Sequence, residues 1–217
     1  MSTENTPQNE RLSIPEVAAA LHPYGVTLAE SHLSDISHYV QTLLKWNKMI
    51  NLTALEDPAE IVAKHFGESI FAASVIPEIS GRLADVGTGA GFPGLPLKIA
   101  FPGINLLLIE PNNKKCAFLT EITQELGLVG VEIYRARYEE TVQLGQKLDY
   151  VCSRALGNYR HLLRWAKTTL KLDGKVVLWV GTDDSTLIGQ TKGWIWRVPT
   201  PIPNSLRRVI LVGKPIP

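Results

Sequence analysis

Four glycines fall within eight residues of this chain, at Gly87, Gly89, Gly91 and Gly94, directly after a short apolar segment. Glycine lets the backbone turn tightly and approach a ligand closely, and the free amides at the start of a following helix attract an electronegative group. A tight turn alone would account for one or two of these glycines, but poorly for four. We therefore expect a small molecule to bind here, with a helix that follows through Leu97.

Two acidic residues near the glycines bear on which molecule binds. The spacing Gly89-x-Gly91-x-x-Gly94 satisfies the dinucleotide fingerprint, and Glu110 follows twenty-one positions after the first of these glycines. A carboxylate there can hold a ribose in dinucleotide sites and in S-adenosylmethionine sites alike, so Glu110 fits both. Asp85, just before the glycines, suits a cationic amino-acid group and would repel a pyrophosphate. The pattern favours S-adenosylmethionine, which carries an ammonium and a sulfonium.

Alternating strands and helices must position these residues. Short apolar runs recur after Gly81, and most are separated by segments long enough for a helix. This alternation is typical of βαβ crossovers and predicts a mostly parallel sheet covered on both faces. Residues 198–204 hold three prolines and are expected to form a loop before the last strand. The expected strands cover residues 83–86, 105–109, 131–134, 148–152, 175–180 and 209–212.

The first eighty residues carry a helical pattern instead. Apolar residues recur at helical spacing from Leu33 to Leu44 and predict one amphipathic helix. We divide the chain into a frayed tail over residues 1–10, a helical cap over 11–80 and a ligand-binding domain over 81–217. Three helices are expected in the cap, because three residue pairs have the spacing of a capping box: Ser13 with Glu16, Thr27 with Glu30, and Asp57 with Glu60.

The composition of the 217 residues is that of a folded protein with one sizeable core, since 45% of them are apolar. The formal net charge is +1, but residues 1–80 hold four basic and ten acidic side chains, whereas residues 81–217 hold eighteen and eleven. No stretch approaches the roughly 18 apolar residues of a membrane span, so we expect a soluble protein. The two cysteines, Cys116 and Cys152, indicate neither a disulfide framework nor a zinc site, and we expect no metal and a cytoplasmic location.

Further motifs, in chain order, are Trp46-Asn47-Lys48, Asn51-Leu52-Thr53, His65-Phe66 with Ser69, the glycine segment 85–96, Arg137-Tyr138-Glu139-Glu140 and Ser153-Arg154-Ala155. Together they resemble those of the ribosomal RNA small subunit methyltransferase G family, also called glucose-inhibited division protein B. The resemblance covers roughly residues 30 to 180 and is most specific in the glycine segment with its prolines. It implies a Rossmann-like class I methyltransferase that modifies N7 of one guanine in 16S ribosomal RNA, with that RNA or the small-subunit particle as its partner.

The resemblance also assigns residues to the cofactor. Where the family usually has Lys-Gly, this chain has Val180-Gly181, and beyond Asp183 little matches except the basic pair Arg207 and Arg208. The residues implied to contact S-adenosylmethionine are Gly87, Phe92, Tyr138, Glu139 and Arg154, with Glu110 at the ribose; Asp85, Gly89 and Gly91 join them from the glycine segment itself.

Methyl transfer to guanine N7 makes modest chemical demands on the protein. The nitrogen is a bare lone pair with no proton to remove, so the reaction needs alignment rather than a general base. We therefore expect no catalytic acid or base. The sequence contains no Pro-Cys pair for attack on a pyrimidine and no Asn/Asp-Pro-Pro-Tyr motif for an exocyclic amine. For His65 two interpretations stay open, contact with the substrate or support of Glu68.

A stripe of basic residues indicates one surface for RNA. Arg160, Arg164, Lys167 and Lys171 follow helical spacing, and Leu163 lies among the apolar residues of the other side. Like charges on neighbouring turns repel one another and favour a bound anion, although a solvated face is the common interpretation of such a stripe. Both interpretations stay open.

A second basic group follows the second and third expected strands. Lys114 and Lys115 fall in the first turn of a helix, where the dipole disfavours cations, so we expect them either to pair with Glu110 or to bind phosphate. Arg137, together with Arg135, could extend the same basic rim.

Two other functions stay open at this point. One is an NAD(P)-dependent oxidoreductase, because the glycine spacing alone does not exclude a dinucleotide. The other is a non-catalytic RNA-binding protein that kept a cofactor pocket. For the methyltransferase we expect a monomer.

Overall fold

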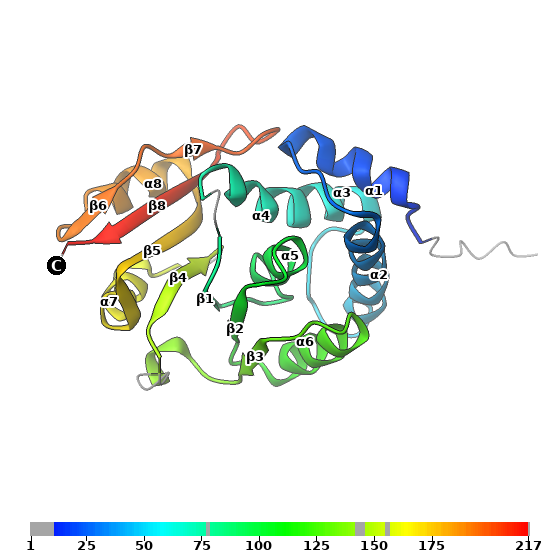
Figure 1. The fold of residues 1–217 in the computed structure, drawn as a ribbon, viewed down its shortest axis with the longest axis horizontal. Helices are drawn as coiled ribbons and strands as arrows, with labels where there is room; N and C mark the ends of the chain where they lie inside the picture. Colours follow the sequence, from blue (N-terminus) through cyan, green and yellow to red (C-terminus); the bar gives the residue numbers. More distant parts are fainter. Residues whose placement is uncertain (1–10, 77–78, 142–145, 155–156, 217) are drawn as a thin grey trace, which may run out of the picture.

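The computed structural model describes residues 11–76, 79–141, 146–154 and 157–216. In these residues eight strands form one sheet in the order β3-β2-β1-β4-β5-β8-β6, with β7 paired to β8 (Figure 1). Strands β1 to β5 run parallel, and β6, β7 and β8 add antiparallel pairs, so the expected mostly parallel α/β fold is confirmed. The strands are β1 (Arg82–Val86), β2 (Asn105–Ile109), β3 (Val131–Tyr134), β4 (Leu148–Ser153), β5 (Leu170–Gly181), β6 (Trp194–Trp196), β7 (Thr200–Pro201) and β8 (Arg208–Pro215).

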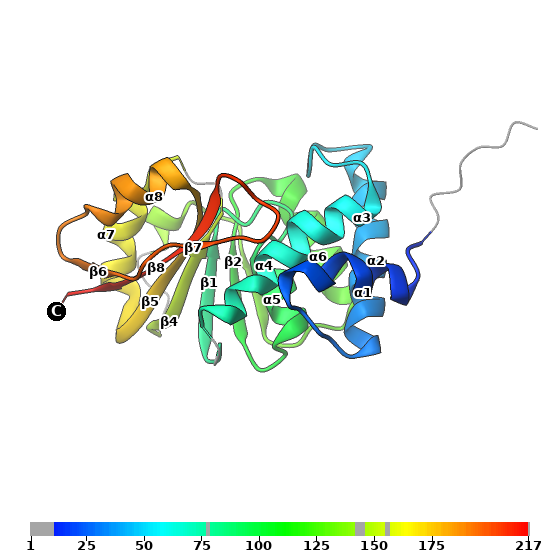
Figure 2. The same cartoon turned by 90° about the horizontal axis from the view of Figure 1, so that it is seen from above.

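Four helices that alternate with the strands are α5 (Gly94–Ala100), α6 (Asn113–Glu125), α7 (Tyr159–Thr169) and α8 (Thr182–Gly189). They cover opposite faces of the sheet (Figure 2). Leu83 and Leu106 point into a core shared with α5, α6 and the N-terminal helices, whereas Ala84 and Leu107 belong to a second core under α7 and α8. Since successive strand residues face opposite sides, both faces must be largely apolar, which explains the short apolar runs in the sequence.

The N-terminal cap consists of α1 (Ile14–Leu21), η1 (His22–Tyr24), α2 (Glu30–Asn47), α3 (Pro58–Ile61), η2 (Val62–Gly67), α4 (Glu68–Ile70) and η3 (Phe71–Ser74). The last four follow without a break, so the third expected helix is present as one helical run with a π-helical segment at η2. Two expected capping boxes have the predicted contacts: Glu16 accepts from the Ser13 amide at 2.8 Å, and Asp57 accepts from the Glu60 amide at 2.7 Å.

The third expected capping box, Thr27 with Glu30, is wrong. Helix α2 begins at Glu30, its N-cap residue is Ala29, and no side chain caps it. The apolar stripe that begins with the buried Leu33 instead fixes where the helix starts, because packing outweighs the contribution of a single cap.

The sequence also missed two short strands at the edge of the sheet. Strand β6 has three residues, too few for a period to show, and β7 falls within the proline-rich segment 198–204 that was expected to be a loop. Both pair with β8, where Thr200 lies opposite Ile210 and Trp196 opposite Gly213. A neighbouring strand thus imposes extended structure on residues whose own pattern indicates none.

Three further expectations concern the chain ends, membranes and metals. The tail expected over residues 1–10 lies outside the described residues. Among the described helices, none combines the length and the apolar character needed to cross a membrane. Within the same residues, His, Cys, Asp and Glu side chains form no group of three or more that could hold a metal ion.

Candidate functional site

The glycine segment joins β1 to α5 at the carboxyl end of the parallel strands, where ligands bind in open α/β sheets. Gly87, Gly89 and Gly91 have φ angles of 70°, 60° and 91°, which residues with a side chain rarely adopt. A Cβ atom at Gly91 would overlap the Tyr39 hydroxyl and the Leu95 side chain. At Gly89 no atom lies within 4 Å of the place a Cβ would take. The loop is therefore packed at Gly91 and open to a ligand at Gly89.

The Asp85 carboxylate lies beneath this loop and is fully buried. Its Oδ2 accepts hydrogen bonds from Thr88 Oγ1 at 2.5 Å and from the Gly94 amide at 2.8 Å. Burial raises the pKa of Asp85 to about 6, and these hydrogen bonds limit the rise. In this structure Asp85 ties the two ends of the loop together, and its Oδ2 is engaged by donors of the loop rather than turned toward the surface.

Glu110 follows β2 and contacts the open part of the loop. Its Oε2 accepts from the Gly89 amide at 3.0 Å and its Oε1 accepts from the Asn112 amide at 2.9 Å. Asn112 in turn caps α6, because its Oδ1 accepts from the amides of Lys114 and Lys115 at 2.9 and 3.1 Å. The expected alternative in which Glu110 pairs with these lysines is not observed in the part of the chain that the structure describes. Among the described residues, neither lysine ammonium group has an ion-pair partner.

A pocket of about 260 Å³ lies next to the loop at the same edge of the sheet. It brings Gly87 together with Tyr138 and Glu139, three residues expected at the cofactor, and with Arg137. The buried Tyr138 ring packs edge-on against Trp165, with centroids 5.6 Å apart. Burial, helped by Glu139, raises the pKa of Tyr138 to about 12, so its hydroxyl stays protonated at neutral pH. The lining residues are Gly87, Ile109, Pro111, Ala136, Arg137, Tyr138, Glu139, Asn158 and His161.

The cap closes the other side of the loop with aromatic rings. Phe92 stacks on Tyr39 at 5.6 Å between centroids and on His65 at 4.5 Å. His65 Nε2 lies 2.7 Å from Thr53 Oγ1. Burial, followed by the positive charge of nearby arginines, lowers the pKa of His65 to about 3, so the ring is neutral at neutral pH.

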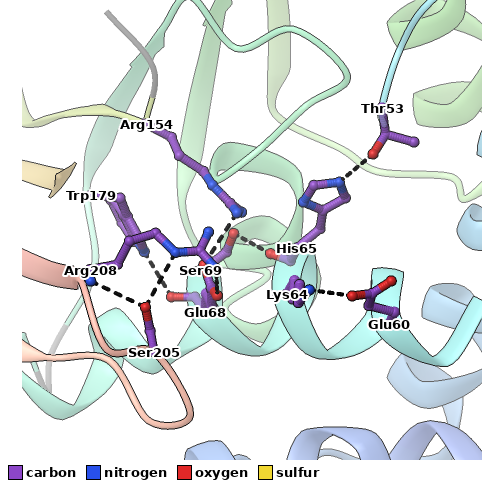
Figure 3. Close-up of polar contacts among 10 residues, drawn as sticks. All are labelled: Thr53, Glu60, Lys64, His65, Glu68, Ser69, Arg154, Trp179, Ser205 and Arg208. Atoms are coloured by element: carbon purple, nitrogen blue, oxygen red, sulfur yellow. Dashed lines mark hydrogen bonds and ion pairs between the residues drawn. The ribbon is translucent and has the colours of Figure 1, made fainter. Parts of the chain in front are cut away.

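An ion-pair cluster around one buried carboxylate lies beside His65 (Figure 3). The carboxylate of Glu68, 2% exposed, joins Arg154 Nη2 at 3.2 Å to Arg208 Nη2 at 2.5 Å. Trp179 Nε1 donates to the Glu68 carbonyl oxygen at 2.7 Å. Arg154 follows β4 and was expected at the cofactor; its Nη1 is buried and has no hydrogen-bond partner among the described residues.

Sequence reasoning did not find this cluster. It singled out Arg154, and it noted His65 and the basic pair at Arg207 and Arg208, but it did not bring Arg208 to the site. The two partners of the shorter ion pair are 140 positions apart. No local signal in the sequence marks Glu68 as buried, because charged and polar residues such as Lys64 and Ser69 also occur in this helical run; its burial and its need for a cation become apparent only in the fold.

The basic residues of α7 share one exposed face, as expected for Arg160, Arg164 and Lys167. The extension of the stripe to Lys171 is wrong, because α7 ends at Thr169. Lys171 instead lies on β5, where it pairs with Asp149 at 2.8 Å. A pocket of about 810 Å³ runs between α7 and α8, with all three α7 cations, Lys192 and the Trp194 ring in its lining.

This protein has the class I methyltransferase fold. Its parallel strands follow the order β3-β2-β1-β4-β5, the antiparallel β8 lies beside β5, and a glycine loop follows β1. The precorrin-6y C5,15-methyltransferase of Geobacter metallireducens GS-15 shares that fold, with a TM-score of 0.56, 14% identity, and coverage of 76% of this chain and 91% of that chain. A mutant of MtNAS in complex with S-adenosylmethionine has a TM-score of 0.61 at 13% identity and covers 94% of this chain and 90% of its own.

Sequence relatives narrow the class to one family. The family model described as rRNA small subunit methyltransferase G matches residues 32–193. The ribosomal RNA small subunit methyltransferase G of Dehalococcoides mccartyi strain BAV1 is 41% identical over 167 residues, which cover 75% of this chain and 70% of that protein. The chain belongs to the rRNA small subunit methyltransferase G family, and the resemblance seen in the sequence is confirmed.

Proposed function

We propose that this protein transfers the methyl group of S-adenosylmethionine to N7 of a guanine in 16S ribosomal RNA, as a monomer in the cytoplasm. Family membership supports a methyltransferase of small-subunit rRNA, and the family resemblance implies the N7 atom. The observation that carries the proposal is the pocket at the carboxyl edge of the sheet, where Gly87, Tyr138 and Glu139 meet beside Glu110 and the open Gly89.

The residues at this edge suit the proposed cofactor. Ile109 and Pro111 give the pocket an apolar wall for a purine ring, and Glu110 offers a carboxylate for ribose hydroxyls. Arg154 has an unpartnered buried donor, Nη1, for an acceptor group such as a carboxylate. Phe92, Gly91 and Asp85 belong to the proposed site by holding the loop in shape.

The chemistry asked of these side chains is positioning. When bound, S-adenosylmethionine supplies a methyl group on a sulfonium, and guanine N7 supplies a lone pair without a proton. No side chain needs to move a proton, so we propose no catalytic acid or base. The neutral His65 ring adds no positive charge beside a cationic donor and a cationic product.

We propose that RNA follows the basic face of α7. Arg160, Arg164 and Lys167 have no acidic partner among the described residues, and the pocket they line shares Asn158 with the pocket proposed for the cofactor. If the RNA strand runs from the reaction site along α7, its backbone phosphates would contact these cations one after another. The proposed RNA contacts are Lys114, Lys115, Arg137, Arg160, Arg164 and Lys167.

The test is methylation by the purified protein with isotopically labelled S-adenosylmethionine and either bare 16S ribosomal RNA or small subunits, followed by mapping of 7-methylguanosine. We expect label at one guanine. Thermal denaturation with S-adenosylhomocysteine and with NADH separates the alternatives. Stabilisation by NADH alone would favour an oxidoreductase. Cofactor binding without transfer of label to bare RNA or to small subunits would favour a non-catalytic RNA-binding protein.

A further inference from the structure

The ion-pair cluster at Glu68 joins three parts of the chain that are far apart in sequence (Figure 3). Glu68 begins α4 of the cap, Arg154 follows β4, and Arg208 begins β8. The region that matches the family model ends at residue 193, so Arg208 lies outside it. A strand beyond the matched region therefore supplies one of the three charged groups.

Arg154 is held in a particular way by this cluster. Glu68 Oε2 contacts only Nη2 of the guanidinium, at 3.2 Å, and Nη1 stays buried without a partner among the described residues. A buried donor of a charged group that lacks an acceptor is costly, so Nη1 would gain from an acceptor that a bound ligand supplies. The ion pair thus fixes one edge of the guanidinium and leaves Nη1, on the other edge, without a hydrogen-bond partner.

Arg208 fixes the carboxylate that fixes Arg154. Its Nη2 lies 2.5 Å from Glu68 Oε1, and its own amide donates to Ser205 Oγ at 3.1 Å, which holds the start of β8. Without Arg208, the Glu68 carboxylate would be buried with a single cation and free to rotate toward it. The orientation of Arg154 therefore depends on Arg208 as well as on Glu68, because the two guanidinium groups share one carboxylate.

We infer that Glu68 and Arg208 are positioning residues for cofactor binding: they orient Arg154, and through Arg208 the strand β8 becomes part of the site. This inference rests on the proposed function, in which Arg154 contacts S-adenosylmethionine. Arg208 itself touches no reacting atom.

If the cluster only stabilised the fold, the variants would behave differently. A substitution at Trp179 distinguishes this structural role from the positioning role. Its indole donates to the backbone carbonyl of Glu68, so it anchors the same helical turn to β5 without contacting the carboxylate. Replacing Trp179 by Phe removes that anchor and leaves both ion pairs. Arg207, exposed and next in sequence, provides a control for charge alone.

The experiment is calorimetric titration of the full chain with S-adenosylhomocysteine, together with thermal denaturation of each variant. For Arg208→Ala we expect binding about tenfold weaker. Arg208→Lys, which keeps a cation near Glu68, should restore most of the affinity. Trp179→Phe should lower Tm and leave Kd within about twofold, and Arg207→Ala should change neither.

Several outcomes would overturn the inference. One is unchanged affinity in Arg208→Ala; another is equal weakening in Trp179→Phe at a similar loss of Tm, which would make the cluster structural. If Arg208→Ala does not fold, Glu68→Gln provides the same comparison, since it removes the charge that joins the two arginines. Failure of the unaltered protein to bind S-adenosylhomocysteine would instead count against the proposed function, so the two failures are distinguishable.

Discussion

The imidazole of His65 lies nearly parallel to the ring of Phe92, with centroids 4.5 Å apart and planes inclined by 27°. One ring comes from the π-helical segment of the cap and the other from the glycine loop. The cap therefore contacts the proposed cofactor loop directly, and the ionisation of one cap residue bears on both.

His65 should make the protein less stable in acid. Its pKa in the fold is about 3, against 6.5 ordinarily, so below pH 6.5 the unfolded chain binds a proton that the folded protein does not. Stability should fall as the pH drops from about 7 toward 3. Thermal denaturation at several pH values should show a smaller acid-induced loss for His65→Gln than for the unaltered protein. Parallel curves for the two proteins would contradict this assignment.

Asp85 should act in the opposite direction. Its pKa is about 6 in the fold and 3.8 ordinarily, so between these values the unfolded chain loses its proton first. The ionised carboxylate disfavours folding at neutral pH by about 3 kcal/mol, an effect that disappears as the pH falls below about 4. On acidification, the unaltered protein should therefore gain stability relative to Asp85→Asn, which has no carboxylate at this position to titrate. A difference independent of pH between 4 and 7.5 would refute the raised pKa.

Two glycines of the loop should respond differently to alanine. Gly91→Ala should destabilise the fold by about 3 kcal/mol or more, because the new Cβ overlaps Tyr39 and Leu95 in addition to the backbone strain at φ 91°. Gly89→Ala should cost only about 1 kcal/mol, since its surroundings are open. It should nevertheless weaken S-adenosylhomocysteine binding. Urea denaturation and calorimetry measure the two effects, and unchanged cofactor affinity in Gly89→Ala would argue against a ligand at this position.

Charge reversal on α7 should weaken RNA binding and should make the binding constant less sensitive to salt concentration. Arg164→Glu removes one proposed phosphate contact and adds a repulsive charge, so the slope of log K against log salt concentration should fall by about 1. Lys45→Glu makes the same change in net charge on an exposed cap residue and is the matched control. Filter binding with 16S ribosomal RNA at several salt concentrations compares them. Equal effects of both variants would mean that α7 contributes only general charge.

Much of the fold could be predicted because its signals are local. The runs at residues 105–109 and 131–134 match β2 and β3 at both ends, since a glycine, Gly103 or Gly130, precedes each run by one or two residues and most of the residues within each run are apolar. The glycine loop was found because its backbone needs positive φ angles that glycine supplies. Where a boundary depends on packing, as at Ala29 before α2 or Thr169 at the end of α7, the sequence pattern placed it incorrectly.

The site was predictable only in part, for the same reason. Glycines, a carboxylate after the second strand and an arginine after the fourth carry position-specific signals. The pairing of Glu68 with Arg208 carries none, because a cap helix and an antiparallel strand meet only once the sheet has formed. Likewise, Asp85 could be expected next to the loop, but not the Thr88 and Gly94 donors that engage its carboxylate.

The aromatic contacts of Tyr39 have a consequence for natural variation in this family. Tyr39 of α2 stacks on Phe92, meets Phe66 edge-on, and donates its hydroxyl proton to the Ala90 carbonyl oxygen. A smaller side chain at any one of these three aromatic positions would leave a void that a larger side chain at either of the other two could fill. Residues 39, 66 and 92 should therefore covary in size among related sequences, although they lie in two helices and a loop that share no sequence neighbourhood.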